Sequence, residues 1–277
     1  MAEKNTGMAA EENPERRKRM NTTITPHKNV NRDVTLLPVS ADQHLVISCD
    51  SCGGVGNKEK DLVKVPPEIT GYYTCRVATM EILAVGARPE VVIDTLAVEW
   101  DPTGKQIYHG IQRFLEESGL NISAINGSTE ENFPMVQTAI GITVIGRVFK
   151  KDLRLNRSRA GDELWMLGLP KVGHEILHPY DPEVASISSI QALLQDPGIT
   201  GMIPVGSKGV GYEASLLAAE SQLKIEWVPD LPVSMDKSAG PSTCVVLSLD
   251  SKILPEWREK LASETFLKLG TLKGVSP

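Results

Sequence analysis

Apolar residues recur along the first half of the chain with two spacings, one typical of strands and one typical of helices. Short apolar runs rich in β-branched residues predict strands over residues 35–39, 44–49, 91–98, 122–125 and 138–148. Helical spacing of apolar residues predicts one helix that opens at Pro66 and Pro67 and ends at Gly86, and a second over residues 104–118. The first half therefore reads β-β-α-β-α-β-β.

The second half repeats this mixture after a polar, charged linker over residues 150–163. Strands are expected over 163–169, 201–205 and 242–250, and helices over 183–195, 209–221 and 255–265. Residues 1–30 contain hardly any apolar side chain, and we expect a disordered tail. The predicted organisation is a tail (1–30), an N-terminal domain (31–150) and a C-terminal domain (151–277), both α+β.

Composition narrows the classes of function. The net charge of −6 argues against broad binding to nucleic acid or to anionic membranes. No apolar run is long enough to span a bilayer, and the polar N-terminus lacks the core of a signal peptide, so we expect a cytoplasmic protein. Cys49 and Cys52 form a single CxxC, which is half of a structural zinc site, and free thiols are the favoured state.

The candidate chemistry begins where the strand over residues 44–49 ends at Asp50. A glycine-rich loop with a lysine follows, and it contains Gly53, Gly54, Gly56, Asn57 and Lys58. Glycines let backbone N–H groups approach phosphate oxygens, and a strand-end carboxylate suits Mg²⁺. Taken alone, this stretch is explained better by a hairpin turn with a surface lysine.

Three further acidic segments strengthen the nucleotide interpretation. Asp33 precedes the first strand, and the single stretch 79–99 places Glu81 inside the first helix and Asp94 within an apolar strand. An acid within an apolar strand is unfavourable unless it has a partner or a metal. The segment INGSTEEN follows another strand and adds Glu130 and Glu131. Four acidic segments near strand ends predict one site.

Several motifs in order resemble the aminoimidazole ribonucleotide synthetase superfamily. They are CDSCGGVGNK, ILAVGARP, NGSTEENFP with ITVIG, RAGDELWMLG, TGMIPVGSKGVGYEASLLAAES and AGPSTCVVLSL, and together they cover roughly residues 31–277. The resemblance implies a two-domain α+β fold. The N-terminal domain would form a β-barrel across a homodimer, and the C-terminal domain would be an α/β sandwich. It also implies ATP and Mg²⁺ bound between the domains and at the dimer interface, together with a small-molecule substrate.

The resemblance assigns roles to individual residues. Metal ligands would be Asp33, Asp50, Glu81 and Glu131, with Glu130 as the alternative to Glu131. ATP contacts would be Gly53, Gly54, Gly56, Asn57, Lys58, Asp94, Asn126, Gly127 and Thr129. Asp50, Lys58 and Lys208 would be catalytic, and Ser207, Lys208, Asp236 and Lys237 would contact substrate. The chain departs from the family pattern at Arg32, Ser128 and Pro204, where members usually carry acids.

The segments CDSCGGVGNKEKD, VGSKGVGYE and DKSAGPSTC look most like the α-ribazole kinase branch, whose members phosphorylate the 5′-hydroxyl of a nucleoside with ATP. Alternatives are a thiamine-monophosphate kinase, a synthetase-like ATP-dependent enzyme and an inactive nucleotide-binding protein. The stretch HEILH satisfies the zinc-protease pattern HExxH. Gly173 before it and Pro179 and Pro182 after it leave room for little more than one helical turn, which disfavours that interpretation.

Overall fold

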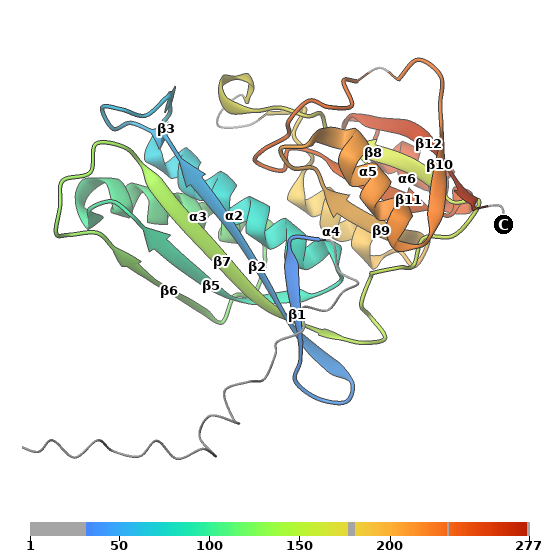
Figure 1. The fold of residues 1–277 in the computed structure, drawn as a ribbon, viewed down its shortest axis with the longest axis horizontal. Coiled ribbons are helices and arrows are strands. Elements are labelled where there is room, and N and C mark those ends of the chain that lie inside the picture. The colour runs from blue at the N-terminus through green and yellow to red at the C-terminus, as the bar shows by residue number, and fades with distance from the viewer. Residues whose placement is uncertain (1–31, 177–180, 232, 276–277) are drawn as a thin grey trace, which may run out of the picture.

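The computed structural model describes residues 32–176, 181–231 and 233–275. The predicted tail over residues 1–30 lies outside the described residues, as does His178 of the HExxH pattern. Two five-stranded sheets form the framework, one in each half of the chain (Figure 1). Residues 150–162, the predicted linker, contain no helix or strand and connect the two sheets.

The N-terminal sheet has the strand order β1-β2-β7-β5-β6. Its strands are β1 (Val34–Pro38), β2 (Gln43–Gly53), β5 (Arg88–Leu96), β6 (Ala124–Thr129) and β7 (Ala139–Phe149). Only the β5–β6 pair is parallel among these five strands. Helices α2 (Pro67–Ala84) and α3 (Lys105–Ser118) cover one face (Figure 1). Both predicted helices and all five predicted strands are confirmed to within a few residues.

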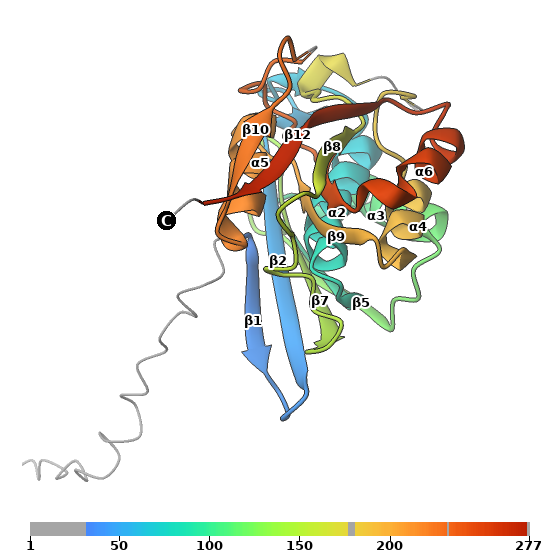
Figure 2. The same cartoon turned by 90° about the vertical axis from the view of Figure 1, so that its right-hand side faces the viewer.

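The C-terminal sheet is antiparallel, with the order β10-β12-β8-β11-β9. Its strands are β8 (Glu163–Leu167), β9 (Ile199–Pro204), β10 (Leu223–Trp227), β11 (Val245–Leu249) and β12 (Phe266–Gly274). The sequence prediction missed β10 and β12. Helix α5 (Gly209–Glu220) lies on one face, whereas α4 (Ile187–Gln195) and α6 (Leu254–Lys260) lie on the other (Figure 2). The predicted helix over 255–265 is wrong at its end, because Phe266 already starts a strand and the helix stops at Lys260.

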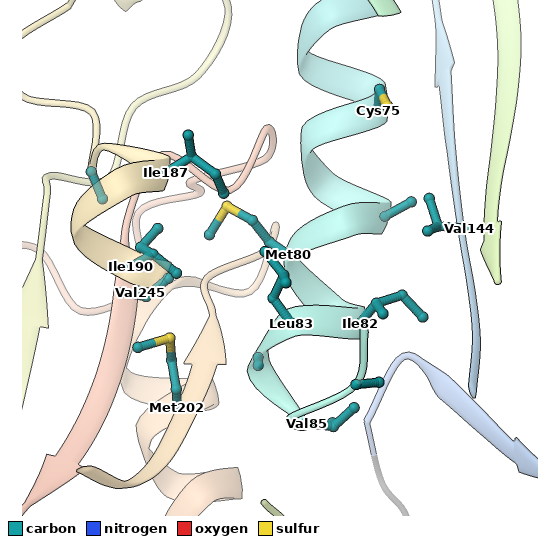
Figure 3. Packing of buried hydrophobic residues seen from close by; sticks show 14 of the residues in the cluster. Cys75, Met80, Ile82, Leu83, Val85, Val144, Ile187, Ile190, Met202 and Val245 are labelled. Carbon is teal, nitrogen blue, oxygen red and sulfur yellow. The ribbon is translucent and has the colours of Figure 1, made fainter. Parts of the chain in front are cut away.

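Helix α2 is buried between the two sheets, and this explains its composition. The sequence predicted a single apolar face, but the helix is buried on several sides. Met80 and Leu83 point toward the C-terminal half, where Ile187 and Met202 lie, while Ile82 points toward the N-terminal sheet (Figure 3). Apolar burial on both sides joins the halves into one continuous core.

Short elements complete the chain and bear on the HExxH pattern. They are β3 (Val55–Gly56), β4 (Val63–Lys64), η1 (Trp100–Gly104), η2 (Gly173–Glu175) and η3 (Ser251–Ile253). His174 and Glu175 lie in the single turn η2, so the described part of HEILH lacks the sustained helix that a zinc protease requires. No helix among the described residues has the length and apolar character needed to cross a bilayer.

Candidate functional site

A cavity of about 470 Å³ lies between the two halves of the chain, and we call it the interdomain cavity. Its N-terminal wall is formed by the end of β2, one side of α2 and the strands β3 and β4. Its C-terminal wall is formed by residues 172–176, the turn after β9 and residues 240–242. Because both sheets and the central helix contribute to it, the fold itself fixes the shape of this cavity.

Four carboxylates line the cavity: Asp33, Asp50, Glu81 and Glu213. Asp50 faces inward because side chains alternate along β2, and Val46 and Ser48 on the same face are buried. Glu81 projects from the last turns of α2, and Glu213 from α5 in the other half of the chain. Three of the four predicted metal ligands are thus brought together, and Glu213 joins them.

Burial and repulsion between neighbouring carboxylates raise the pKa values of three of these acids. The pKa of Glu81 is raised to about 8, first by burial, with smaller contributions from the charges of neighbouring acids. Burial likewise raises the pKa of Asp50 to about 6 and that of Glu213 to about 7. The charge of Arg32 opposes the rise at both glutamates. Such a cluster of acids with raised pKa values is typical of functional sites that receive a cation.

The donor chemistry of the cluster fits Mg²⁺, which prefers hard oxygen ligands. In the described part of the chain, no three His, Cys, Asp or Glu side chains already stand close enough to hold an ion. In phosphate-handling sites, Mg²⁺ is bound by one or two carboxylates together with waters and substrate phosphates. One or two of Asp33, Asp50 and Glu81 would hold the ion in this way.

The rest of the interdomain cavity is largely apolar. Its apolar lining consists of Val55, Val63, Val65, Ile69, Val77 and Ile176. Tyr73 and the hydroxyl groups of Thr70 and Thr74 line the same space. Burial raises the pKa of Cys52 to about 11, so this lining thiol stays protonated and is a poor nucleophile. A charged end beside an apolar slot suits an organic molecule that carries one polar, reacting group.

A second, shallower cavity of about 290 Å³ lies at the edge strand β6. It gathers four of the predicted ATP contacts, Asp94, Asn126, Gly127 and Thr129, with the side chains of Trp100 and Tyr108. Gly127 lies beside Asp94 in the parallel β5–β6 pair, and a Cβ there would come within 1.6 Å of an Asp94 carboxylate oxygen. Glycine is therefore required for Asp94 to occupy its buried position.

The predicted phosphate loop after β2 does not line the interdomain cavity with its glycines or with Lys58. Lys58 Nζ lies 2.6 Å from a carboxylate oxygen of Glu99, so its charge is already paired. Asp61 organises the loop by accepting hydrogen bonds from the N–H of Lys58 at 2.8 Å and from Thr138. Within a single chain, these hydrogen bonds hold the loop folded against Asp61.

The remaining predicted residues lie near the C-terminal wall of the interdomain cavity or at the edge of the N-terminal sheet. Ser207 lines the cavity, whereas Lys208 lies at the start of α5 with its ammonium 4.2 Å from the centre of the Tyr212 ring. Lys237 pairs with Glu175 at 3.0 Å, and Asp236 is exposed beside it. None of Lys208, Asp236 and Lys237 lines the interdomain cavity.

Glu131 stands apart from the other predicted metal ligands. One of its carboxylate oxygens accepts hydrogen bonds from the N–H of Trp100 at 2.8 Å and from the Thr129 hydroxyl at 2.9 Å. These contacts hold it beside the second cavity. Glu131 does not line the interdomain cavity with Asp33, Asp50 and Glu81. The expectation that one chain gathers these four acids is therefore wrong.

Two acids at or near the site, Glu213 and Asp61, were not predicted from the sequence. Glu213 lies in the VGSKGVGYE segment that the resemblance singled out, but its helical position alone does not reveal that it faces the cavity. Asp61 closes the sequence GGVGNKEKD and was passed over, although an acid at the end of a glycine-rich loop often folds that loop back.

Comparisons with known proteins agree with this architecture. Residues 31–148 match the family model described as AIR synthase related protein, N-terminal domain. That match covers the N-terminal sheet, its two helices and three of the four cavity acids. None of the curated proteins compared with the sequence gives a match.

Solved structures extend the likeness to both halves. The thiamine monophosphate kinase of Aquifex aeolicus gives a TM-score of 0.61 at 17% identity, with 87% of this chain and 88% of that chain covered. Hydrogenase maturation protein HypE in complex with ATP gives 0.63 at 14% identity, covering 89% of this chain and 81% of that one. T. maritima PurL complexed with ADP gives 0.66 at 15% identity, covering 90% of this chain but 43% of PurL. At these identities the likeness establishes a shared α+β fold.

Proposed function

We propose that this chain is an ATP- and Mg²⁺-dependent enzyme that activates or phosphorylates an oxygen of a small organic molecule held in the interdomain cavity. One observation carries the proposal: acids from both halves of the chain, Asp33, Asp50, Glu81 and Glu213, line one cavity with an apolar slot beside them. The fold is shared with proteins described as complexed with ATP, ADP or the analogue AMPPCP, which supports a nucleotide as the co-substrate.

The chain's own groups would act mainly by placing charge. Phosphoryl transfer requires little covalent work from the protein, so positioning and neutralisation dominate. Mg²⁺, when bound, supplies positive charge to the phosphate oxygens. Asp50 and Glu81 would orient that charge, and Glu213, which lines the same cavity from the other half of the chain, would accept the proton of an attacking hydroxyl. The apolar slot would exclude water from the reacting group.

The molecule that accepts the phosphoryl group is proposed separately from the class of enzyme. The resemblance points to α-ribazole as one candidate, whereas the solved structures of similar fold include thiamine monophosphate kinases. Both acceptors combine a flat heterocycle with a polar reacting group, and this combination matches an apolar slot with a charged end. We therefore propose a kinase or synthetase of this superfamily, with α-ribazole and thiamine monophosphate as the acceptors to be tested first.

A homodimer is part of this proposal. The face of the N-terminal sheet that points away from α2 and α3 carries partly exposed apolar side chains, among them Leu45, Ile47, Ile93 and Ile145. Register pairs Ile47 with Ile145, which makes an apolar row across neighbouring strands. A second copy covering this face would bury the row.

The decisive experiment measures ADP release from Mg·ATP with α-ribazole, thiamine monophosphate, formylglycinamidine ribonucleotide, selenide or no acceptor. The matched control is Asp50→Asn, which removes the cavity carboxylate of β2 with almost no change in shape. We expect turnover with one acceptor and at least a hundredfold loss in the variant. ATP binding without turnover for any acceptor would favour an inactive binding protein, an alternative suggested by Ser128 and Pro204 at positions where acids are expected.

A further inference from the structure

A further cavity lies along the linker between the two halves of the chain. Its charged lining residues are basic, whereas those of the interdomain cavity are acidic. This linker cavity, of about 570 Å³, contains three arginines, Arg154, Arg157 and Arg159, and no acidic residue lines it. Its other walls come from the end of α4 and the start of β9. In a chain of net charge −6, three arginines without a lining acid form a local positive site.

Arg154 is held rigidly at the base of this cavity. Its guanidinium donates to the carbonyl oxygens of Ile199 and Leu194, each at 2.6 Å. Both acceptors are backbone groups at or beyond the end of α4, so Arg154 also caps that helix. A guanidinium has five N–H donors, and the two bonds leave others available for a ligand.

Close packing of the linker against α2 fixes the position of Arg154. Its backbone N–H donates to the carbonyl of Val85 at 2.9 Å. Gly86 has a φ of +82°, and a Cβ there would come within 2.5 Å of the Asp152 carbonyl, so glycine is needed for the linker to lie this close. The arginine is thus placed by the fold rather than by a flexible surface loop.

Asp196 and Asp152 act electrostatically on Arg154, but neither forms an ion pair with it. Within residues 32–176, 181–231 and 233–275, none of the three arginines takes part in an ion pair. Arg157 donates to the carbonyl of Lys151, and Arg159 is exposed. Burial lowers the pKa of Arg154, and the charge of Arg157 lowers it further, while Asp196 and Asp152 oppose this. Two neighbouring guanidinium groups that repel each other would be stabilised by an anion between them.

We propose that the linker cavity binds a small phosphate-bearing anion, either inorganic phosphate or a phosphate monoester, at a site separate from the interdomain cavity. Planar guanidinium groups with several free donors recognise phosphate oxygens in pairs, which favours phosphate over a spherical anion. The cavity has room for a nucleotide-sized monoester, and the acidic overall charge disfavours a nucleic acid strand.

Phosphate binding to the full chain provides the test. Titration calorimetry at constant ionic strength would compare inorganic phosphate, glycerol 3-phosphate, glycerol and chloride, since a monoester without adenine does not compete for a nucleotide site. We expect phosphate and the monoester to bind, and glycerol and chloride not to bind. Tighter binding of the monoester than of inorganic phosphate would identify an ester as the ligand, and the reverse order would identify the free ion.

Variants locate the site. Arg157→Gln with Arg159→Gln should weaken phosphate binding at least tenfold, and lysine at both positions should restore only part of it, because an ammonium group keeps the charge but cannot pair with two phosphate oxygens at once. Arg113→Gln, which removes an arginine that lines neither cavity, should leave binding unchanged. Melting temperatures without phosphate would verify that each variant is folded.

Asp50→Asn separates this site from the proposed enzymatic one. It should abolish turnover and leave phosphate binding intact, and phosphate binding should persist even if no acceptor is ever turned over. Loss of phosphate binding in Asp50→Asn, unchanged binding in the double glutamine variant, equal binding of chloride, or much tighter binding of a short RNA would each overturn the proposal.

Discussion

Arg32, one residue before the candidate metal ligand Asp33, forms a bidentate ion pair with Glu220 at the end of α5. Its Nε and Nη2 donate to the two carboxylate oxygens at 2.6 and 2.8 Å, and Nη1 donates to the carbonyl of Met202. Both charged side chains are almost fully buried. The pair joins the start of the N-terminal sheet to the C-terminal half and so fixes Asp33 at the interdomain cavity.

The first prediction concerns this ion pair. Arg32→Met or Glu220→Leu alone leaves a buried charge without its partner, and we expect each to lower the free energy of unfolding by about 3–5 kcal/mol. The double variant removes both charges and should be clearly more stable than the sum of the single losses implies. Urea unfolding of the four proteins measures this coupling. Additive losses would contradict a direct pair.

The same residue shows where sequence reasoning stops. Arg32 was noted only as a departure from an acidic pair, because its partner Glu220 lies 188 residues away and no local pattern connects them. Asp33, Asp50 and Glu81 could be predicted because each lies in a segment that resembles a motif of the superfamily, although β2 continues past Asp50 to Gly53 and does not end there as expected. Glu213 could not, because which face of α5 meets the cavity depends on how the two halves pack.

The elements of the fold also differ in whether they could be predicted from the sequence. The strands and helices of the N-terminal half were predictable because each is a local pattern of apolar residues with clear turns. Strand β12 was missed, since Gly270 and two lysines dilute its alternation and only its pairing with β8 and β10 makes it a strand. Helix α2 was predicted with one apolar face because burial on several sides becomes visible only once both sheets are in place.

Asp94 predicts a pH dependence of stability. Burial raises its pKa to about 6, so the folded chain binds this proton more tightly than the unfolded chain does. The stabilisation is present below about pH 4 and is lost as the pH rises through 6. Asp94→Asn should therefore be more stable than the parent at pH 7.5, by about 2 kcal/mol, and nearly equal to it at pH 4. Chemical unfolding at both pH values measures the difference.

The matched control for Asp94 is Asp101→Asn, which removes the same charge from an exposed position in the same half of the chain. It should change stability by less than about 0.5 kcal/mol at either pH. A stability gain that is the same at pH 4 and at pH 7.5 would contradict burial of the ionised Asp94 as the cause.

Lys58 allows a structural role to be separated from a catalytic one. Because its ammonium pairs with the half-buried Glu99, Lys58→Met should lower the free energy of unfolding by about 1–2 kcal/mol. We expect the affinity for Mg·ATP to change less than threefold, since Lys58 lines neither the interdomain cavity nor the second cavity. Fluorescence titration with a labelled nucleotide provides the measurement. A tenfold loss of affinity would instead support the phosphate contact that the sequence predicted.

The exposed face of the N-terminal sheet predicts the state of assembly. Ile47 and Ile145 are register partners on adjacent strands and stand at the centre of this face, half-exposed in the single chain. A glutamate there would place an unpaired charge inside an apolar contact between two copies, which is strongly unfavourable. We therefore expect Ile47→Glu or Ile145→Glu to convert a dimer into a monomer in sedimentation experiments. Leu62→Glu, at an 83% exposed position outside this sheet, should leave the dimer intact. If the parent sediments as a monomer, or if all three variants behave alike, the sheet face is not the contact between copies.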